Sequence, residues 1–190
     1  MAVRLCEFLR AGLWPALSLV LALTAAIPAP PARAADDSTK DPDSLALGAG
    51  IFDVRRRHDL PLKNDAGLFD LEYRSDKQLW WFKPMIGAFG TTEGAFYTYA
   101  GIRLDVYFGD RLVFTPSFAP GLYHQGNGND LGFEVEFRSS AEIAWRFDDF
   151  SRLSFGVSHI SNASLGRKNP GVENLTVMYS IPFHKLIGGD

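Results

Sequence analysis

Apolar and polar side chains alternate almost residue by residue between positions 132 and 147. Phe133, Val135 and Phe137 fall on one side of this segment, whereas Glu134 and Glu136 fall on the other. A period of two is typical of a β-strand with one apolar and one polar face, because successive side chains of a strand point in opposite directions. The same alternation, interrupted by Gly, Asn, Asp and Pro, recurs along the chain without a convincing helical segment. The pattern therefore predicts an all-β fold.

The alternating segments predict about eight strands. Their expected ranges are 45–54, 67–75, 79–91, 95–108, 111–124, 132–147, 150–161 and 173–183. Eight antiparallel strands can close into a small barrel that leaves no free edge. We therefore expect an eight-stranded antiparallel up-and-down β-barrel.

The apolar face of such a barrel can point inward around a ligand, as in a soluble lipocalin-like barrel, or outward toward lipid. The polar face mixes acids with arginines, which suits a cross-linked interior of a transmembrane barrel. These residues are Glu72, Asp105, Glu134, Glu136, Glu142, Arg74, Arg103, Arg138 and Arg146. Aromatic residues near the strand ends suit the girdles at the two membrane interfaces. They are Trp80, Trp81, Tyr97, Tyr107, Trp145 and Phe147. Both features favour the transmembrane barrel.

The start of the chain has the pattern of a secretion leader. Arg4 and Arg10 give it a positive start, residues 13–27 are largely apolar, and Ala32-Arg33-Ala34 is a small-x-small cleavage site. We expect residues 1–34 to be removed, residues 35–44 to be flexible, and residues 45–190 to form the barrel.

Charge and cysteine content narrow the class further. The formal net charge is −3, and no basic stripe of the kind that binds nucleic acid is present. The one cysteine, Cys6, lies in the expected leader, so the exported chain would hold no disulfide. Small exported domains usually need disulfides unless their size or a membrane stabilises them. Export without disulfides is compatible with an outer membrane.

A histidine and a serine interrupt the apolar face of the segment 150–161. At a period of two, His159 and Ser161 follow Val157 on that face. Glu173 begins the next strand and shares its phase with Leu175. Because the two strands are antiparallel neighbours, Glu173 is expected to lie beside His159. A carboxylate on a lipid-directed face is costly without a partner, which favours a pairing with the histidine.

This arrangement predicts a nucleophile, a base and an orienting acid. Ser161 would attack an ester carbonyl, His159 would accept its proton, and Glu173 would orient the imidazole. Backbone amides and asparagine side chains of the loop after Ser161 could bind the developing oxyanion. Arg167 and Lys168 in that loop could contact phosphates of an anionic glycolipid. The spacing alone also fits a polar strand end that faces lipid headgroups.

The stretch from Phe155 to Phe183 resembles the lipid A 3-O-deacylases of the PagL type, which are outer-membrane esterases of Gram-negative bacteria. Its His159-x-Ser161-Asn162 and Asn169-Pro-Gly elements and Glu173 match that family's motif. The resemblance implies an eight-stranded barrel with a Ser-His-Glu triad on its lipid-facing wall. It also implies that Ser161 is the nucleophile, His159 the base and Glu173 the acid. By the same resemblance, Asn162 and Asn169 line the oxyanion site.

The sequence therefore predicts a serine esterase of the bacterial outer membrane that removes a hydroxyacyl chain from lipid A of lipopolysaccharide. Its expected partners are this substrate and outer-membrane lipids, without nucleic acid, and a homodimer is left open. No metal or cofactor is expected, since Asp53, His58 and Asp59 fit a solvated turn better than a metal site. Two alternatives are a non-catalytic structural or adhesion barrel in the outer membrane and a soluble periplasmic lipid-binding barrel. The segment after Phe183 has no assigned role.

Overall fold

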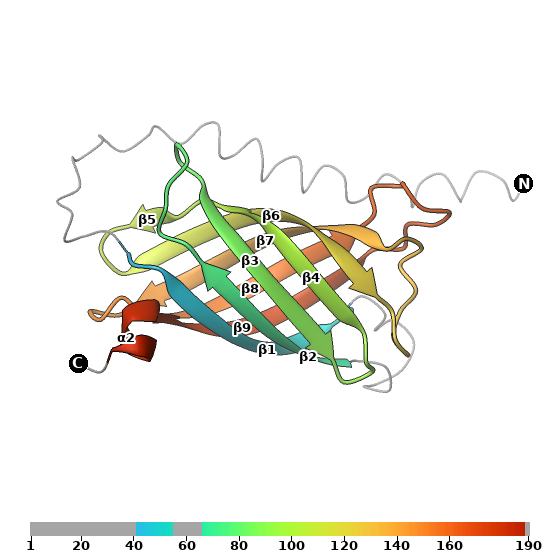
Figure 1. Cartoon of the computed structure of the whole chain (residues 1–190), viewed down its shortest axis with the longest axis horizontal. Helices are drawn as coiled ribbons and strands as arrows, with labels where there is room; N and C mark the ends of the chain where they lie inside the picture. The colour runs from blue at the N-terminus through green and yellow to red at the C-terminus, as the bar shows by residue number, and fades with distance from the viewer. Residues whose placement is uncertain (1–40, 55–65, 189–190) are drawn as a thin grey trace, which may run out of the picture. The chain divides into compact units, whose positions relative to one another are not determined.

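The computed structural model describes residues 41–54 and 66–188, and in this part the chain forms a closed antiparallel β-barrel (Figure 1). Its elements are β1 (Ser44–Phe52), β2 (Ala66–Arg74), β3 (Lys83–Thr91), β4 (Phe96–Arg103), β5 (Val106–Phe108), β6 (Leu112–His124), β7 (Val135–Arg146), β8 (Arg152–Ser161), β9 (Val172–Pro182) and α2 (Phe183–Ile187). The strands pair in the order β4-β3-β2-β1-β9-β8-β7-β6-β5, and a β4–β6 pairing closes the sheet. The predicted eight-stranded antiparallel barrel is confirmed. The expected leader, residues 1–34, lies outside the described residues, and so does the start of the expected flexible segment 35–44.

β4 and β5 are the two halves of one interrupted strand, because both pair with β6. The sequence predicted this strand to be continuous over 95–108. The interruption lies at Leu104 and Asp105, opposite Pro116 of β6. Pro116 has no N–H to donate to the ladder and only accepts a hydrogen bond from the Leu104 N–H, at 3.0 Å.

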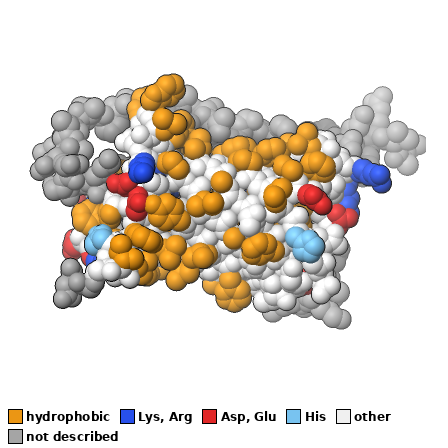
Figure 2. Space-filling view, in the orientation of Figure 1, with side chains coloured by type: hydrophobic (Ala, Val, Ile, Leu, Met, Phe, Trp, Pro, Cys, Tyr) orange, Lys and Arg blue, Asp and Glu red, His pale blue; other side chains and the backbone are white. Residues whose placement is uncertain are grey.

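The barrel turns its apolar face outward. On β8, Leu153, Phe155 and Val157 are about half exposed, while Ser154 and Ser158 on the opposite face are buried. Figure 2 shows hydrophobic side chains spread over the visible wall, with charged side chains gathered near its two ends. Because an outward apolar belt is typical of a barrel in lipid, the predicted transmembrane orientation is confirmed and the soluble lipid-binding alternative does not fit.

The interior is filled with paired charges. Arg74 of β2 contacts both carboxylate oxygens of Glu142 on β7, at 2.8 and 2.7 Å, and Glu72 at 2.6 Å. Arg138 lies 3.6 Å from both Asp70 and Glu72. Buried charges are tolerated when each has such a partner. These cross-barrel pairs therefore explain why acids and arginines alternate with the apolar residues of the strands.

An apolar cluster fills the end of the barrel that carries the β6–β7 and β8–β9 loops. Its buried members are Phe52, Ala66, Leu68, Met85, Phe89, Ala95, Tyr97, Tyr99, Ala119, Tyr123, Leu131, Ile160 and Val172. Ile160 and Val172 are the inward-facing neighbours of the predicted site residues on β8 and β9. The cluster thus gives that part of the wall a closely packed backing.

Four further details differ from the sequence predictions. Glu134, expected on the inner polar face, is exposed in the β6–β7 loop. Tyr97 is buried inside the barrel, so its place in an outer aromatic girdle was wrong. Residues 79–82 form the tip of a hairpin instead of the start of β3. The helix α2 was not predicted, because five residues are too few for a recognisable helical period. Among the described residues, no helix is long and apolar enough to cross a membrane.

Candidate active site

His159 and Glu173 face each other across the β8–β9 ladder on the outer wall of the barrel. The register pairs the two residues directly, and His159 Nδ1 lies 3.1 Å from Glu173 Oε1. Their side chains are 33% and 27% exposed, so the pair is only partly shielded from the surroundings. The imidazole is therefore anchored through Nδ1, which leaves Nε2 as the ring nitrogen for exchange of a proton with another group.

Ser161 ends β8 two residues beyond His159 and shares its outward face. Residues at this spacing lie ~6–7 Å apart along a strand. Within the described residues, no hydrogen bond joins the Ser161 hydroxyl to His159. Such a bond is often long in an enzyme without substrate and shortens only in the reacting complex. The structure thus brings the acid and the base into contact and places the predicted nucleophile beside them.

A second outward serine lies next to the histidine. Ser139 of β7 pairs with His159 in the β7–β8 ladder, on the side opposite Glu173. Directly paired residues of antiparallel strands have Cβ atoms about 4.5–5.5 Å apart, so this hydroxyl is also near the imidazole. The sequence analysis did not single out Ser139, because β7 lies far from the motif along the chain.

Asn162 links two loops from inside the protein. Its side chain is fully buried, and its Nδ2 donates hydrogen bonds to the carbonyls of Leu131 and Lys168, at 2.8 and 2.9 Å. Its backbone N–H donates to Asn169 Oδ1 at 3.0 Å. The Asn162 side chain therefore holds the β6–β7 loop against the β8–β9 loop. Its backbone N–H and the exposed Asn169 lie in the loop directly after Ser161.

Gly171 packs against the imidazole, and sequence reasoning did not assign it to the site. Its φ of +63° lies in the left-handed region, and a Cβ at this position would be 2.8 Å from His159 Cε1. Glycine is the one residue that satisfies both requirements without strain. Gly171 is the glycine of the Asn169-Pro-Gly element, but that motif gave no sign of its contact with the imidazole.

The two predicted cationic residues differ in their surroundings. Lys168 forms an ion pair with Asp130 of the β6–β7 loop, with 2.8 Å between Nζ and Oδ2. The hydrogen bond from Lys168 lowers the pKa of Asp130 below its ordinary value of 3.8. Arg167 is exposed, and the described residues offer it no ion pair. Arg167 is thus the cation that is open to a ligand, whereas Lys168 would have to leave Asp130.

Of the remaining candidates, Asp53 falls within the described residues. The Asp53 N–H donates a hydrogen bond to Asn174 Oδ1 at 3.1 Å, which places Asp53 at the rim of the barrel. His58 and Asp59 lie outside the described residues. Within the described part of the chain, no group of three His, Cys, Asp or Glu side chains is placed to hold a metal ion.

A closed antiparallel barrel with a polar interior and an apolar outer belt is the architecture of integral outer-membrane β-barrel proteins, and this one carries a His–Glu pair on its outer wall. Residues 67–182 match the sequence profile of the family described as lipid A 3-O-deacylase (PagL). Because this match spans more than half of the chain, the protein belongs to that family. It is an outer-membrane barrel of the lipid A deacylase family.

A solved structure of similar fold agrees with the barrel. The crystal structure of the outer membrane enzyme PagL is similar at a TM-score of 0.59 and 16% identity, over 73% of this chain and 99% of that chain. The outer membrane protein Ail of Yersinia pestis, in a phospholipid bilayer nanodisc, gives a TM-score of 0.46 and 11% identity. That comparison also covers 73% of this chain and 99% of the other. No curated protein sequence matches this chain significantly.

Proposed function

We propose that this protein is a serine esterase that hydrolyses a 3-O-linked hydroxyacyl chain from lipid A of lipopolysaccharide. The observation that carries the proposal is the contact of 3.1 Å between His159 Nδ1 and Glu173 Oε1 on the lipid-facing wall, next to Ser161. A charged or hydrogen-bonding pair is costly at such a place and is expected mainly where it has a function. Family membership supplies the substrate class.

The proposed reaction follows from the roles of the three side chains. The Ser161 hydroxyl attacks the ester carbonyl while His159 Nε2 takes its proton, and Glu173 stabilises the imidazolium through Nδ1–H. The tetrahedral intermediate then releases the sugar hydroxyl, which receives the proton from His159, and leaves an acyl group on Ser161. Water, deprotonated by His159, attacks this acyl ester and releases the hydroxy fatty acid. In each half of the reaction His159 gives back the proton that it has taken, so the reaction consumes only water.

The oxyanion needs hydrogen-bond donors near Ser161. We assign this role to the backbone N–H of Asn162 and to the side-chain amide of Asn169. At present the Asn162 N–H donates a hydrogen bond to Asn169 Oδ1, at 3.0 Å. In the reaction, the substrate oxygen would take the place of Oδ1, and Asn169 would donate to it through Nδ2. The buried Asn162 side chain would act indirectly, by fixing the loop that carries both donors. Loss of one such donor lowers the rate by about 10²–10³-fold in other hydrolases.

The position of the site along the barrel suits an ester near lipid headgroups. The apolar wall beside the triad, formed by Phe155, Val157 and Leu175, would contact the acyl chains of lipid A. The loop that carries Arg167 and Lys168 lies at the rim, where phosphates of the glycolipid would be reached. Longer loops face the cell exterior in outer-membrane barrels, and the β6–β7 and β8–β9 loops are longer than the turns at 109–111 and 147–151. This favours the outer leaflet as the place of the reaction.

Two further expectations belong to this proposal. We infer that residues 1–34 direct export and are then removed, since a barrel of this family works in the outer membrane. We also keep the homodimer as a hypothesis, in which a second copy covers part of the apolar wall. Cross-linking of the folded protein in vesicles at several protein-to-lipid ratios would test it, and a product that disappears on dilution would contradict it.

A fluorophosphonate probe tests the proposed nucleophile, because such probes modify only serines that a neighbouring base activates. We expect the folded protein in phospholipid vesicles to be labelled at Ser161, as shown by mass spectrometry of its peptides. Ser161→Ala should abolish labelling. Ser139→Ala is the matched control, since it removes the other outward serine beside His159, and it should leave labelling intact. Labelling at Ser139, or none at either serine in folded protein, would contradict the proposal.

A further inference from the structure

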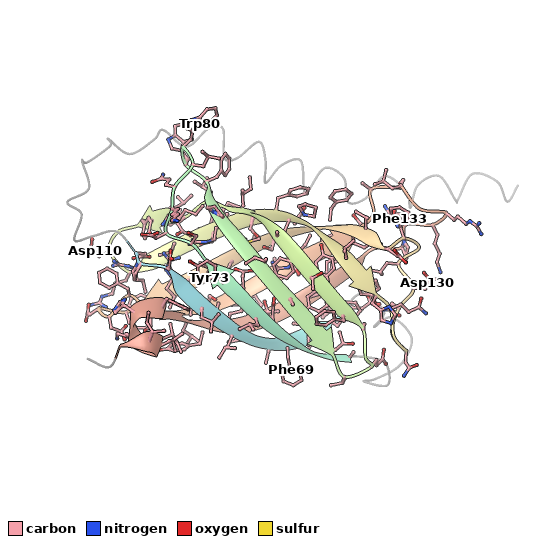
Figure 3. All side chains as sticks on the ribbon, viewed as in Figure 1. Phe69, Tyr73, Trp80, Asp110, Asp130 and Phe133 are labelled. Carbon is pink, nitrogen blue, oxygen red and sulfur yellow. The ribbon has the colours of Figure 1, made fainter. Side chains whose placement is uncertain are left out.

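One acidic side chain inside the barrel has no cation beside it. Glu136 is the second residue of β7, which follows the β6–β7 loop that Asp130 and Phe133 mark in Figure 3. Its side chain is fully buried, and within residues 41–54 and 66–188 it forms no ion pair. Arg138, the next inward residue of β7, contacts acids of β2 instead. Glu136 therefore stands outside the ion pairs that fill the interior.

The surroundings of the Glu136 carboxyl group supply few polar partners. Tyr97 and Tyr123 of the apolar cluster face this part of the interior, but their hydroxyls donate to the backbone carbonyls of Glu136 and Asn129, at 3.0 and 2.8 Å. Glu136 Oε1 lies 3.5 Å from Asn162 Nδ2, which is a long hydrogen bond. Glu136 Oε2 is buried and has no hydrogen-bond partner in the described part of the chain.

The side-chain amide of Asn162 has a complementary deficit. Its Nδ2 carries two hydrogens, and the carbonyls of Leu131 and Lys168 accept both, at 2.8 and 2.9 Å. These two carbonyls identify the amide nitrogen, because an oxygen at this place would face two acceptors. Glu136 Oε1 is thus a third acceptor for a group with two hydrogens. Asn162 Oδ1 is buried, and among the described residues no donor reaches it.

A proton on Glu136 removes both deficits. An ionised carboxyl group only accepts hydrogen bonds, whereas a protonated one also donates through its O–H. Asn162 Oδ1 belongs to the same amide group as the nitrogen 3.5 Å from Glu136, so a rotation of the carboxyl group brings the O–H to it. The neutral form also avoids the cost of burying a charge without a partner.

We propose that Glu136 is protonated in the folded protein and is a positioning residue of the candidate active site, because its O–H donates to Asn162 Oδ1. Asn162 directly follows Ser161, so the peptide between them carries the N–H that we assign to the oxyanion. With both atoms of its amide bonded, the inward side chain fixes the rotation of that peptide and holds the N–H beside Ser161. This catalytic consequence rests on the proposed function, whereas the contact of Glu136 with Asn162 does not.

Infrared spectroscopy of the folded protein tests the proton. A protonated carboxyl group absorbs at a higher frequency than a carboxylate or an amide, and a detergent without ester groups leaves that region clear. We expect a band of this kind at neutral pH that is missing from Glu136→Gln. Glu134→Gln is the matched control, since it removes an exposed glutamate two residues away, and it should retain the band. If Glu136→Gln instead loses carboxylate bands, the proposal is overturned.

Two substitutions of Glu136 test the positioning role. Glu136→Gln supplies an N–H donor in a side chain of the same shape, and it should keep the wild-type rate of lipid A deacylation. Glu136→Met fills the space without a donor. We expect it to lower kcat by about 10-fold, the factor by which one hydrogen bond shifts an equilibrium. KM should stay unchanged, because the oxyanion forms only after the substrate is bound. Hydrogen exchange of the 162–165 amides should accelerate in Glu136→Met and not in Glu136→Gln.

The outcomes separate this proposal from the proposed function. A wild type that leaves lipid A unchanged overturns the esterase, and the infrared band and the exchange rates then still decide whether Glu136 holds Asn162. An active wild type without a band from Glu136 overturns this proposal alone. So does a folded Glu136→Met with the wild-type kcat, or a Glu136→Gln that loses as much activity as Glu136→Met.

Discussion

His159 lies between Glu173 on the neighbouring strand and Gly171 in the loop before that strand. A methyl group at position 171 would be 2.8 Å from His159 Cε1, so Gly171→Ala should displace the imidazole. A displacement of about 1 Å can cost about 10²-fold in rate when it misplaces a reacting group. We expect Gly171→Ala to lower the rate of lipid A deacylation by that factor in folded protein.

Gly109 offers a matched control for this substitution. Its φ of +67° is close to the +63° of Gly171, but no atom lies within 4 Å of a Cβ built on it. Gly109→Ala therefore carries a similar backbone strain without a contact to the site, and it should keep its activity. Equal rates for Gly171→Ala and the wild type would show that the imidazole does not need this glycine.

At the scale of residues, the sequence was informative where the strand period determined direction. The period placed His159, Ser161 and Glu173 on one face, because alternation continues to the end of each strand. The same period puts the Asn162 side chain on the inner face, one residue after Ser161. The sequence analysis assigned Asn162 to the oxyanion site by resemblance and did not predict that its side chain links two loops. The contacts of Gly171 and Ser139 with the histidine depend on the loop path and on the β7–β8 register. Neither can be read from one strand.

At the scale of elements, the β6–β7 and β8–β9 loops support each other. The exposed Asp130–Lys168 ion pair stabilises the contact between the two loops while Asp130 is ionised. The hydrogen bond from Lys168 holds the pKa of Asp130 below its ordinary 3.8. A lowered pKa means that this contribution is present above about pH 4 and is lost as the pH falls through the lowered value. We expect hydrogen exchange of the 162–171 amides, corrected for intrinsic rates, to accelerate in that acid range.

The variant Asp130→Asn removes the charge but keeps the shape of the side chain. It should show faster exchange of the same amides at neutral pH and no additional acceleration in acid. Exchange of the β8 amides serves as the internal control, because those amides are in the barrel ladder. If wild type and Asp130→Asn behave alike over the whole pH range, the ion pair does not order the loops.

At the scale of the whole molecule, the barrel depends on its interior charges. Arg74 pairs with Glu72 and Glu142, all of them buried, so Arg74→Met would leave Glu142 without this cation and Glu72 with the more distant Arg138. Loss of one member of a buried pair costs about 3–5 kcal/mol. We expect the free energy of unfolding, measured with urea in phospholipid vesicles, to fall by that amount.

The pair between Arg111 and Asp148 provides the comparison. It has a similar length of 2.7 Å, but its side chains are 44% and 88% exposed. Exposed pairs contribute about 0–1 kcal/mol, so Arg111→Met should hardly change the free energy of unfolding. A similar loss for both variants would mean that the interior pairs are no more important than the surface ones.

The architecture of the whole barrel was largely predictable, because alternation reports both the strands and their two faces. Most strand ends were within a few residues of the observed ones. The exceptions have physical reasons: Pro116 interrupts the pairing of β6 with β4 and β5, and residues 79–82 are apolar yet form a projecting turn. Tyr97 was misplaced because an aromatic near a strand end suits either face. The sequence pattern allowed the apolar face to point inward or outward and favoured outward. The buried, paired charges of the interior show directly that it points outward.

The central claim is that Ser161 makes this barrel a lipid A esterase. Mass spectrometry of lipid A from cells that express the wild type or Ser161→Ala tests it most directly. We expect the wild type alone to remove the mass of one hydroxyacyl chain, with both proteins folded in the outer membrane. Identical spectra for these two proteins would contradict the claim: an unmodified lipid A in both cases would favour a non-catalytic barrel, and loss of the chain in both would leave the enzyme but exclude Ser161 as its nucleophile.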